Sequence, residues 1–151
     1  MIRVLVAEDS HAARELLVAI LESDPGIEVV GQAADGAEAV EMAERLRPDL
    51  VTMDIQMPGM DGFEATRQIM VRAPAPILMV SSLARREDVE LSLKATRLGA
   101  VMVLPKPAGP GSDGFARDRD ELVAMARAMA GVKVVRRWAS TLGPAPAAPP
   151  V

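Results

Sequence analysis

Short apolar runs alternate along the chain with segments in which apolar residues recur every three or four positions. The apolar runs are rich in β-branched side chains and cover residues 2–7, 27–31, 50–54, 77–80 and 101–105. Strands that alternate with helical segments are typical of βαβ units, whose helices cover a parallel sheet. Because nearly continuous apolar strands are typical of sheets buried on both faces, the pattern predicts an α/β fold with five strand–helix repeats.

Helix start and stop signals divide the segments between the strands. Ser10 is placed to cap the first helix, and Asp24-Pro25-Gly26 ends it. Two capping-box patterns, Asp35 with Glu38 and Asp61 with Glu64, open the second and third helices. Pro48 ends the second helix, and Gly99 is a plausible C′ residue for the fourth. The last three helices are expected over residues 62–72, 87–98 and about 118–130.

The polarity of the strand ends suggests an order for the sheet. Only the run 27–31 has no polar residue at its end, which fits an edge strand. The flavodoxin-like order 2-1-3-4-5 has such an edge and brings the first and third strands to the switch point, where ligands bind. We therefore expect one (βα)5 flavodoxin-like domain over residues 1–130, with helices on both faces of the sheet. Residues 131–151 are expected to be a C-terminal extension that ends in a Pro/Ala-rich, linker-like tail.

Composition narrows the class of protein. The length of 151 residues favours a single domain, and half of the residues are hydrophobic although only three are aromatic, so the core must be aliphatic. A net charge of −4 disfavours nucleic-acid binding, and the absence of cysteine excludes disulfides and thiolate metal sites. The first apolar run is interrupted by Arg3 and is too short for a signal sequence or a membrane span. The cytoplasm is the expected location.

Polar side chains follow four of the five predicted strands. Glu8 and Asp9 follow the first, Asp54 ends the third, Ser81 follows the fourth and Lys106 follows the fifth. Because the carboxyl ends of parallel strands meet at one edge of the sheet, these side chains are expected to converge. Three carboxylates that share a crevice repel one another by about 1–4 kcal/mol per pair, which a protein tolerates where it binds a cation. Oxygen ligands without His or Cys favour Mg²⁺, whose charge together with that of Lys106 would balance the three carboxylates.

A carboxylate beside Mg²⁺ can act as a nucleophile and form an aspartyl phosphate. Asp54 is the best candidate because it lies on a central strand, and Lys106 and a hydroxyl would then stabilise the transferring phosphoryl group. The segment 53–62, M-D-I-Q-M-P-G-M-D-G, resembles the phosphoacceptor loop of response-regulator receiver domains, usually seen as D-x-x-M-P-x-M-D-G. The acidic pair, Ser81 and the Lys106–Pro107 dipeptide accompany that loop in the family, whose fold is CheY-like.

The resemblance implies a role for each matching residue. Asp54 would accept phosphate from a histidine kinase, Asp9 would ligate Mg²⁺ directly, and Glu8 would do so largely through water. The backbone carbonyl of Gln56 would complete the metal site. Ser81 would be the switch hydroxyl and Lys106 would pair with the phosphoryl group, before a Lys106–Pro107 peptide that is typically cis in the family. Phosphorylation would then reposition the fourth helix, the fifth strand and the fifth helix as a protein-binding face.

Residues 68–83, with L-G-A-V at 98–101 and the long Gly/Pro/Ser loop after Lys106, resemble more narrowly the receiver of the chemotaxis protein-glutamate methylesterase, CheB. This resemblance implies a CheA-like kinase as phosphodonor. It also implies an output protein, or a C-terminal methylesterase domain, as the target. The esterase needs Ser, His and Asp, but the single histidine is His11, expected to be an exposed helix residue, so no hydrolytic triad can be assembled. The chain is therefore expected to be no enzyme beyond its own phosphoryl uptake and loss, either as a free-standing receiver or as the regulatory part of a methylesterase.

One position differs from the residue that receivers usually carry. The position three residues before the lysine is usually Phe or Tyr and here is Val103, so no ring is present for a rotamer switch. Gln56 and Leu83 occupy positions that flank the approach of water to the phosphoryl group in the family. The apolar Leu83 predicts slower dephosphorylation than a charged residue would give.

Three other functions remain open at this point. A phosphatase of the haloacid-dehalogenase type also uses a strand-end Asp and Mg²⁺, but needs a second Asp where this chain has Gln56. A nucleotide-binding module would need a glycine-rich phosphate loop, which the chain lacks. A docking module that is never phosphorylated would not require the intact acidic site. The sequence leaves open the cognate kinase, the oligomeric state and whether Val151 is a natural terminus.

Overall fold

The structure is a computed structural model that describes residues 1–82, 89–99 and 102–134. Within them, five strands and five helices alternate along the chain. The strands are β1 (Ile2–Ala7), β2 (Ile27–Ala33), β3 (Leu50–Met53), β4 (Ile77–Ser81) and β5 (Met102–Pro105). The helices are α1 (His11–Glu22), α2 (Gly36–Leu46), α3 (Gly62–Arg72), α4 (Val89–Arg97) and α5 (Phe115–Ala130).

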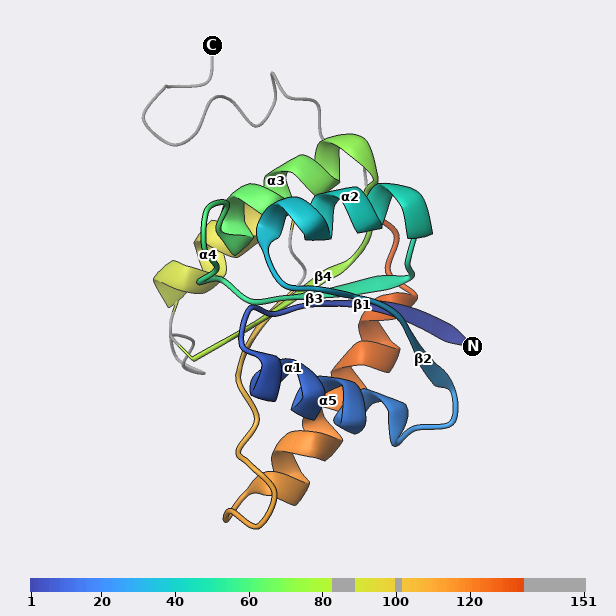
Figure 1. Ribbon diagram of the computed structural model, residues 1–151, viewed down its shortest axis with the longest axis vertical. Helices are drawn as coiled ribbons and strands as arrows, with labels where there is room; N and C mark the ends of the chain where they lie inside the picture. The colour runs from blue at the N-terminus through green and yellow to red at the C-terminus, as the bar shows by residue number, and fades with distance from the viewer. Residues whose placement is uncertain (83–88, 100–101, 135–151) are drawn as a thin grey trace.

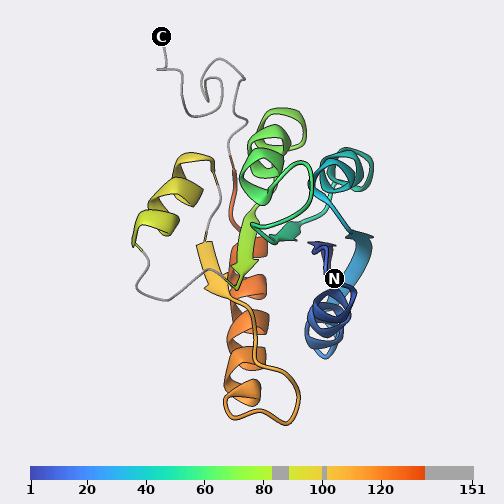
Figure 2. The same cartoon turned by 60° about the vertical axis from the view of Figure 1, so that its left-hand side comes forward.

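The strands form one parallel sheet in the order β2-β1-β3-β4-β5, as predicted. In Figure 1, α2 and α3 lie on one side of the sheet and α1 and α5 on the other, while Figure 2 shows α4 beside the β5 edge. Alternate residues of each strand face the two layers: Val4 and Val6 pack with α1 and α5, whereas Leu5 and Ala7 pack with α2 and α3. The doubly covered α/β sheet is therefore confirmed.

The predicted caps explain where three helices begin. The hydroxyl of Ser10 accepts a hydrogen bond from the Ala13 amide at 3.2 Å. The Asp35 carboxylate accepts one from the Glu38 amide at 2.8 Å, while the Glu38 carboxylate accepts one from the Ala34 amide. Asp61 likewise accepts from the Glu64 amide at 2.9 Å. The bonds that Ser10, Asp35 and Asp61 accept satisfy amides of the first helical turn that have no partner within the helix.

The second capping box is only half formed. Instead of reaching back toward Asp61, the Glu64 carboxylate binds Arg67 and Gln68 within α3. A charged guanidinium is a stronger partner for a carboxylate than a neutral amide, which accounts for the difference.

The fifth helix begins earlier than predicted. It starts at Phe115, directly after Gly114, whose φ of +86° places it in the left-handed region that glycine tolerates. The residue expected to start the helix, Asp118, is used elsewhere: its carboxylate accepts a hydrogen bond from the Ala108 amide at 3.0 Å and so closes the loop after β5. Strand β2 extends two residues beyond its expected end, because Gln32 and Ala33 still pair with β1.

The Lys106–Pro107 peptide is trans, so the expectation of a cis bond is wrong for this structure. The trans preference before proline is only about 0.5–1 kcal/mol, so sequence alone decides neither isomer. The expected start of α4 at Glu87, the apolar Leu83 and Ala100–Val101 of the methylesterase-like motif lie outside the described residues.

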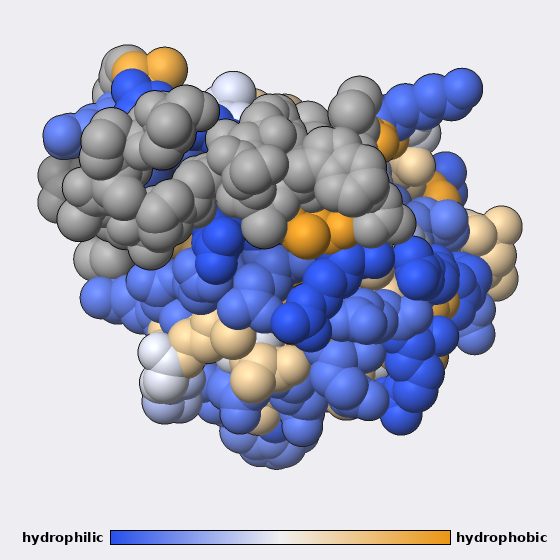
Figure 3. All heavy atoms as spheres, turned by 90° about the horizontal axis from the view of Figure 1, so that it is seen from above, coloured by the Kyte–Doolittle hydropathy of each residue, from blue (hydrophilic) through white to orange (hydrophobic). Residues whose placement is uncertain are grey.

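The surface view from the side of α2 and α3 is mostly hydrophilic where the chain is described, with small pale and orange areas (Figure 3). Among the described residues, no helix is both long enough and apolar enough to span a bilayer.

Candidate functional site

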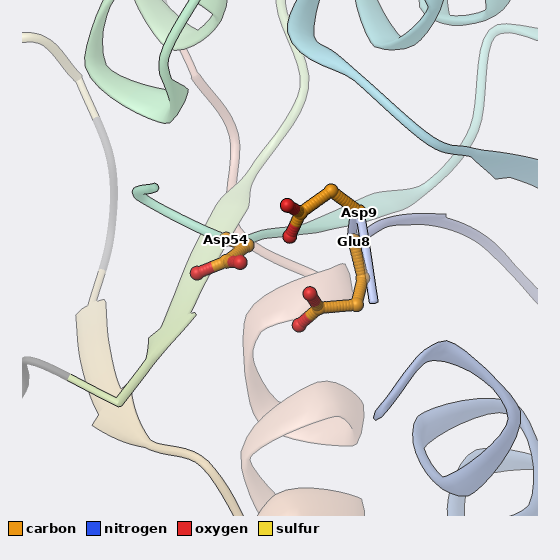
Figure 4. A group of neighbouring side chains, drawn as sticks. All are labelled: Glu8, Asp9 and Asp54. Carbon is orange, nitrogen blue, oxygen red and sulfur yellow. The ribbon is translucent and has the colours of Figure 1, made fainter. Parts of the chain in front are cut away.

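Three carboxylates meet at the carboxyl edge of the sheet. Glu8 and Asp9 follow β1 and Asp54 follows β3, and one oxygen from each lies within 4.8 Å of the other two (Figure 4). Glu8 is fully buried and Asp54 is 4% exposed, whereas Asp9 is open to solvent. The cluster is therefore a polar site with a closed inner side and an open outer side.

Backbone hydrogen bonds hold the two inner carboxylates in place. The Asp54 amide donates to the Ala7 carbonyl at 3.0 Å, and the Glu8 amide donates to the Ala33 carbonyl at 2.9 Å. Both bonds continue the sheet ladders one residue beyond the strands. The side chains therefore leave a rigid edge rather than a mobile loop.

Lys106 brings a positive charge to this edge. Its Nζ lies 2.9 Å from Oε1 of Glu8 and 3.5 Å from Oδ2 of Asp54. The Lys106 amide donates to the Ser81 carbonyl at 3.3 Å, which carries β5 one residue further along β4. Ser81 itself is fully buried at the end of β4. The residues predicted from the ends of β1, β3, β4 and β5 thus lie at one edge of the sheet.

The loop between β3 and α3 is shaped by glycine. The Gly62 amide donates to the Ile55 carbonyl at 2.8 Å, and a Cβ at Gly62 would overlap the backbone carbonyl of Asp54. Gly59 has a φ of +74°, which any larger residue would adopt only with strain. This close packing brings the start of α3 directly against the Asp54 backbone.

A hollow of about 550 Å³ opens beside the cluster. Asp9 and Gln56 line it next to the carboxylates, and Phe63 and Lys94 line it on the side of α3 and α4, where the Lys94 ammonium lies 4.2 Å from the Phe63 ring centroid. Gln56 is exposed in the same loop. The open side of the cluster is therefore accessible to a small group or to a side chain of a partner.

Burial raises the pKa of Glu8 from 4.5 to about 7, although the hydrogen bonds from Lys106 and the Ser10 amide act in the opposite direction. The charge of Asp54 raises it further. Burial of Lys106 lowers its pKa, but the two carboxylates outweigh this and raise it overall, so the ammonium stays charged. Without a bound metal, the buried part of the site therefore does not fully stabilise the negative charge of both Glu8 and Asp54.

This balance predicts how stability depends on pH without Mg²⁺. The folded-state pKa of Glu8, about 7, is above the usual 4.5, so its protonation favours the folded state. That contribution is complete below the unfolded pKa and is lost as the pH rises through 7. Urea unfolding in a chelator should show the free energy of unfolding falling by on the order of 2 kcal/mol between pH 5 and 8 relative to Glu8→Gln. Parallel profiles for the two proteins would contradict this assignment.

The donor set fits Mg²⁺. Oε1 of Glu8 is buried and lies 2.9 Å from Nζ of Lys106, so a charged carboxylate oxygen faces the inside of the cluster. Among the described residues the cluster holds only carboxylate oxygens, the ligands that Mg²⁺ prefers, and its exposed side leaves room for the waters that this ion keeps.

Three further residues complete the comparison with the sequence. His11 is exposed on the first turn of α1, as expected, and its Nε2 lies 2.9 Å from the Glu15 carboxylate. Val103 is half-buried and packs against the core on the side of α2 and α3. No motif in the sequence marks Arg14, although its Nη1 donates to the Glu8 carbonyl at 2.8 Å. Only its position, one helical turn after the Ser10 cap that follows the acidic pair, could have indicated it.

Residues 4–112 match the response regulator receiver domain family. A protein-glutamate methylesterase/protein-glutamine glutaminase of Myxococcus xanthus is 57% identical over 150 residues, which are 99% of this chain and 42% of that protein. This chain therefore spans less than half the length of that relative. Because residues 4–112 of this chain match the receiver family, the part of the relative that resembles this chain includes a receiver domain.

Solved structures give the same result. The response regulator domain of Thermotoga maritima CheB is 44% identical, with a TM-score of 0.80 over 88% of this chain and 98% of that domain. A CheY6 structure from R. sphaeroides in complex with the P1 domain of CheA3 is 32% identical, with a TM-score of 0.70 over 87% and 98%. A CheX–CheY–BeF₃–Mg²⁺ complex from Borrelia burgdorferi is 30% identical, with a TM-score of 0.70 over 87% and 90%. Taken with the fold and the acidic edge of the sheet, these similarities show that the chain belongs to the response regulator receiver family and has a receiver of the CheB type.

Proposed function

We propose that this receiver accepts a phosphoryl group on Asp54 from a phosphohistidine of a CheA-like kinase. The observation that carries the proposal is the placement of Lys106 at 2.9 Å from Glu8 and 3.5 Å from Asp54, within a cluster of three carboxylates. An ammonium at that point can pair with a phosphoryl group attached to Asp54. The CheY6–CheA3 and CheY–BeF₃–Mg²⁺ similarities support the same chemistry.

In the proposed step, an oxygen of Asp54 attacks phosphorus as the bond from phosphorus to the histidine nitrogen breaks. The leaving imidazole keeps the bonding electron pair and takes a proton, and Asp54 becomes an acyl phosphate. Lys106 then shifts its contact from the carboxylates toward one phosphoryl oxygen, and the Ser81 hydroxyl donates to another. Glu8, Asp9, Asp54 and the Gln56 carbonyl would hold Mg²⁺, which neutralises charge on the transferring group when bound.

The response to phosphorylation would pass through Ser81 and Lys106, because they end β4 and β5. Drawing both toward the phosphoryl group would bias α4, β5 and α5 between two packings and so present a different face to a partner. The relation to methylesterases suggests a methylesterase domain as that partner, in chemotaxis-type signalling. Val103, which offers no ring to rotate, implies that this response does not depend on an aromatic rotamer change.

The proposal predicts a single Mg²⁺-dependent modification. Intact mass spectrometry after incubation with acetyl phosphate and Mg²⁺ should show one added phosphoryl group on most molecules, and at most a few per cent when the metal is chelated. Beryllofluoride should raise the melting temperature only in the presence of Mg²⁺, because it mimics the phosphoryl group in the same place.

Two results would overturn the proposal. Absence of any added phosphoryl group together with no response to beryllofluoride would leave the chain as a docking module. Continuous hydrolysis of phosphate esters, rather than one stoichiometric modification, would instead indicate a phosphatase.

A further inference from the structure

We propose that Arg14 positions the acidic pair: its guanidinium holds the Glu8 carbonyl and thereby directs the Asp9 carboxylate toward Asp54. The inference rests on the proposed function, since it concerns how the same site binds Mg²⁺. It adds a residue outside the cluster to those that determine metal affinity.

The two acids are held in different ways. The Glu8 side chain has its own partners: Oε2 accepts from the Ser10 amide at 3.0 Å, and Oε1 lies 2.9 Å from Nζ of Lys106. Asp9 is exposed, and within the described part of the chain its carboxylate makes no hydrogen bond or ion pair. With no side-chain partner among the described residues, the position of the Asp9 carboxylate depends on the backbone that carries it.

That backbone is held on both sides of Glu8. The Glu8 amide donates to the Ala33 carbonyl at 2.9 Å, which ties it to the end of β2. The Glu8 carbonyl, which belongs to the peptide leading into Asp9, accepts from Nη1 of Arg14 at 2.8 Å. A hydrogen bond from a charged donor restrains the plane of that peptide more strongly than one from a neutral donor. Rotation of this plane would turn Asp9 away from Asp54.

Arg14 is itself restrained. It is half-buried on α1, and its Nη2 lies 3.2 Å from Nδ1 of His11, whose other ring nitrogen contacts Glu15. The Ser10 cap fixes the start of α1 directly after the acidic pair. The guanidinium thus bridges the end of β1 and the first turns of α1, so the loop and the helix hold the acids as one unit.

The charge of Arg14 and its positioning effect act in opposite directions on Mg²⁺. A positive group beside the Glu8 carbonyl repels a nearby divalent cation, so charge alone predicts tighter binding when Arg14 is neutralised. Loss of positioning predicts weaker binding, because residues that orient metal ligands typically contribute about 10–100-fold in affinity. The sign of the change distinguishes the two.

The test is calorimetric titration of Mg²⁺ alone into the unphosphorylated chain. Arg14→Met should weaken binding about tenfold, the lower end of the range for groups that orient ligands. Arg14→Lys keeps the charge and a donor but loses the planar fork, so it should fall between wild type and Arg14→Met. Arg127→Met is the matched control: it removes the same charge and two hydrogen bonds to Asp24, in the loop before β2 at the opposite edge of the sheet. It should lower the melting temperature and leave Mg²⁺ affinity within about twofold.

Wild-type or tighter Mg²⁺ binding by Arg14→Met overturns the inference and leaves the proposed function intact, provided the wild type still takes up phosphate. If Arg14→Met does not fold, wild-type affinity in Arg14→Lys overturns the inference, and weakened affinity supports it. A wild-type chain that neither binds Mg²⁺ nor takes up phosphate removes the proposed function, and the inference with it.

Discussion

Replacing Asp54 with asparagine should abolish phosphoryl uptake. The amide has the shape of the carboxylate but lacks its nucleophilic oxygen, so no acyl phosphate can form at this position. Incubation with acetyl phosphate and Mg²⁺ should then leave the intact mass of Asp54→Asn unchanged, a loss of at least about 100-fold relative to wild type.

The variant should still fold. Asp54 is buried among two other carboxylates, and removing one of three like charges relieves repulsion of about 1–4 kcal/mol per pair while giving up the contact with Lys106 at 3.5 Å. Thermal melting by circular dichroism checks this point. Asp120→Asn is the matched control, because Asp120 is an exposed acid on α5, and its uptake should equal that of wild type. Mg²⁺-dependent phosphorylation of Asp54→Asn would place the acceptor on another residue.

Replacing Gly62 with alanine should strongly lower the free energy of unfolding. A Cβ at this position would overlap the Asp54 carbonyl and press against the Ile55 backbone, neither of which can move aside as a flexible side chain could. Overpacking against backbone at a helix start should cost about 3 kcal/mol. Urea unfolding measures this difference.

Gly131→Ala provides the comparison. Gly131 follows α5 with a φ of −89°, and apart from its chain neighbours no atom of the described residues lies within 4 Å of the position of a new Cβ. Its free energy of unfolding should stay within about 0.5 kcal/mol of wild type. If Gly62→Ala were as stable as Gly131→Ala, the close packing of α3 on the Asp54 loop would not contribute to folding.

Much of the fold could be predicted because its signals are local. Apolar runs with a strand-like composition placed β1, β3 and β4 to within a residue, and Ser10, Asp35 and Asp61 marked the starts of α1, α2 and α3. Such signals act over one turn of helix or a few strand residues, so no knowledge of the rest of the chain is needed. The start of α5 was missed because Asp118 bonds to Ala108, ten residues earlier and outside the range of a cap.

The chemistry of the site was predictable for a related reason. In a parallel sheet every strand ends at the same edge, so polar residues at strand ends indicate a shared location before any distance is known. Glu8, Asp9, Asp54, Ser81 and Lys106 could therefore be named together from their positions in the sequence. What could not be derived is how they pair: Lys106 lies closer to Glu8 than to Asp54, and burial brings the pKa of Glu8 to about 7.

The sequence by itself determined the order of strands and helices along the chain, the caps that begin α1, α2 and α3, and the set of carboxylates at the sheet edge. Only the tertiary structure decided which groups touch, including Arg14 on the Glu8 carbonyl, Gly62 on the Asp54 carbonyl and the trans Lys106–Pro107 peptide. The physical reason is the distance along the chain over which each kind of interaction acts. Periodicity and caps depend on neighbours along the chain, whereas desolvation, peptide orientation and close backbone contacts depend on how separate elements pack.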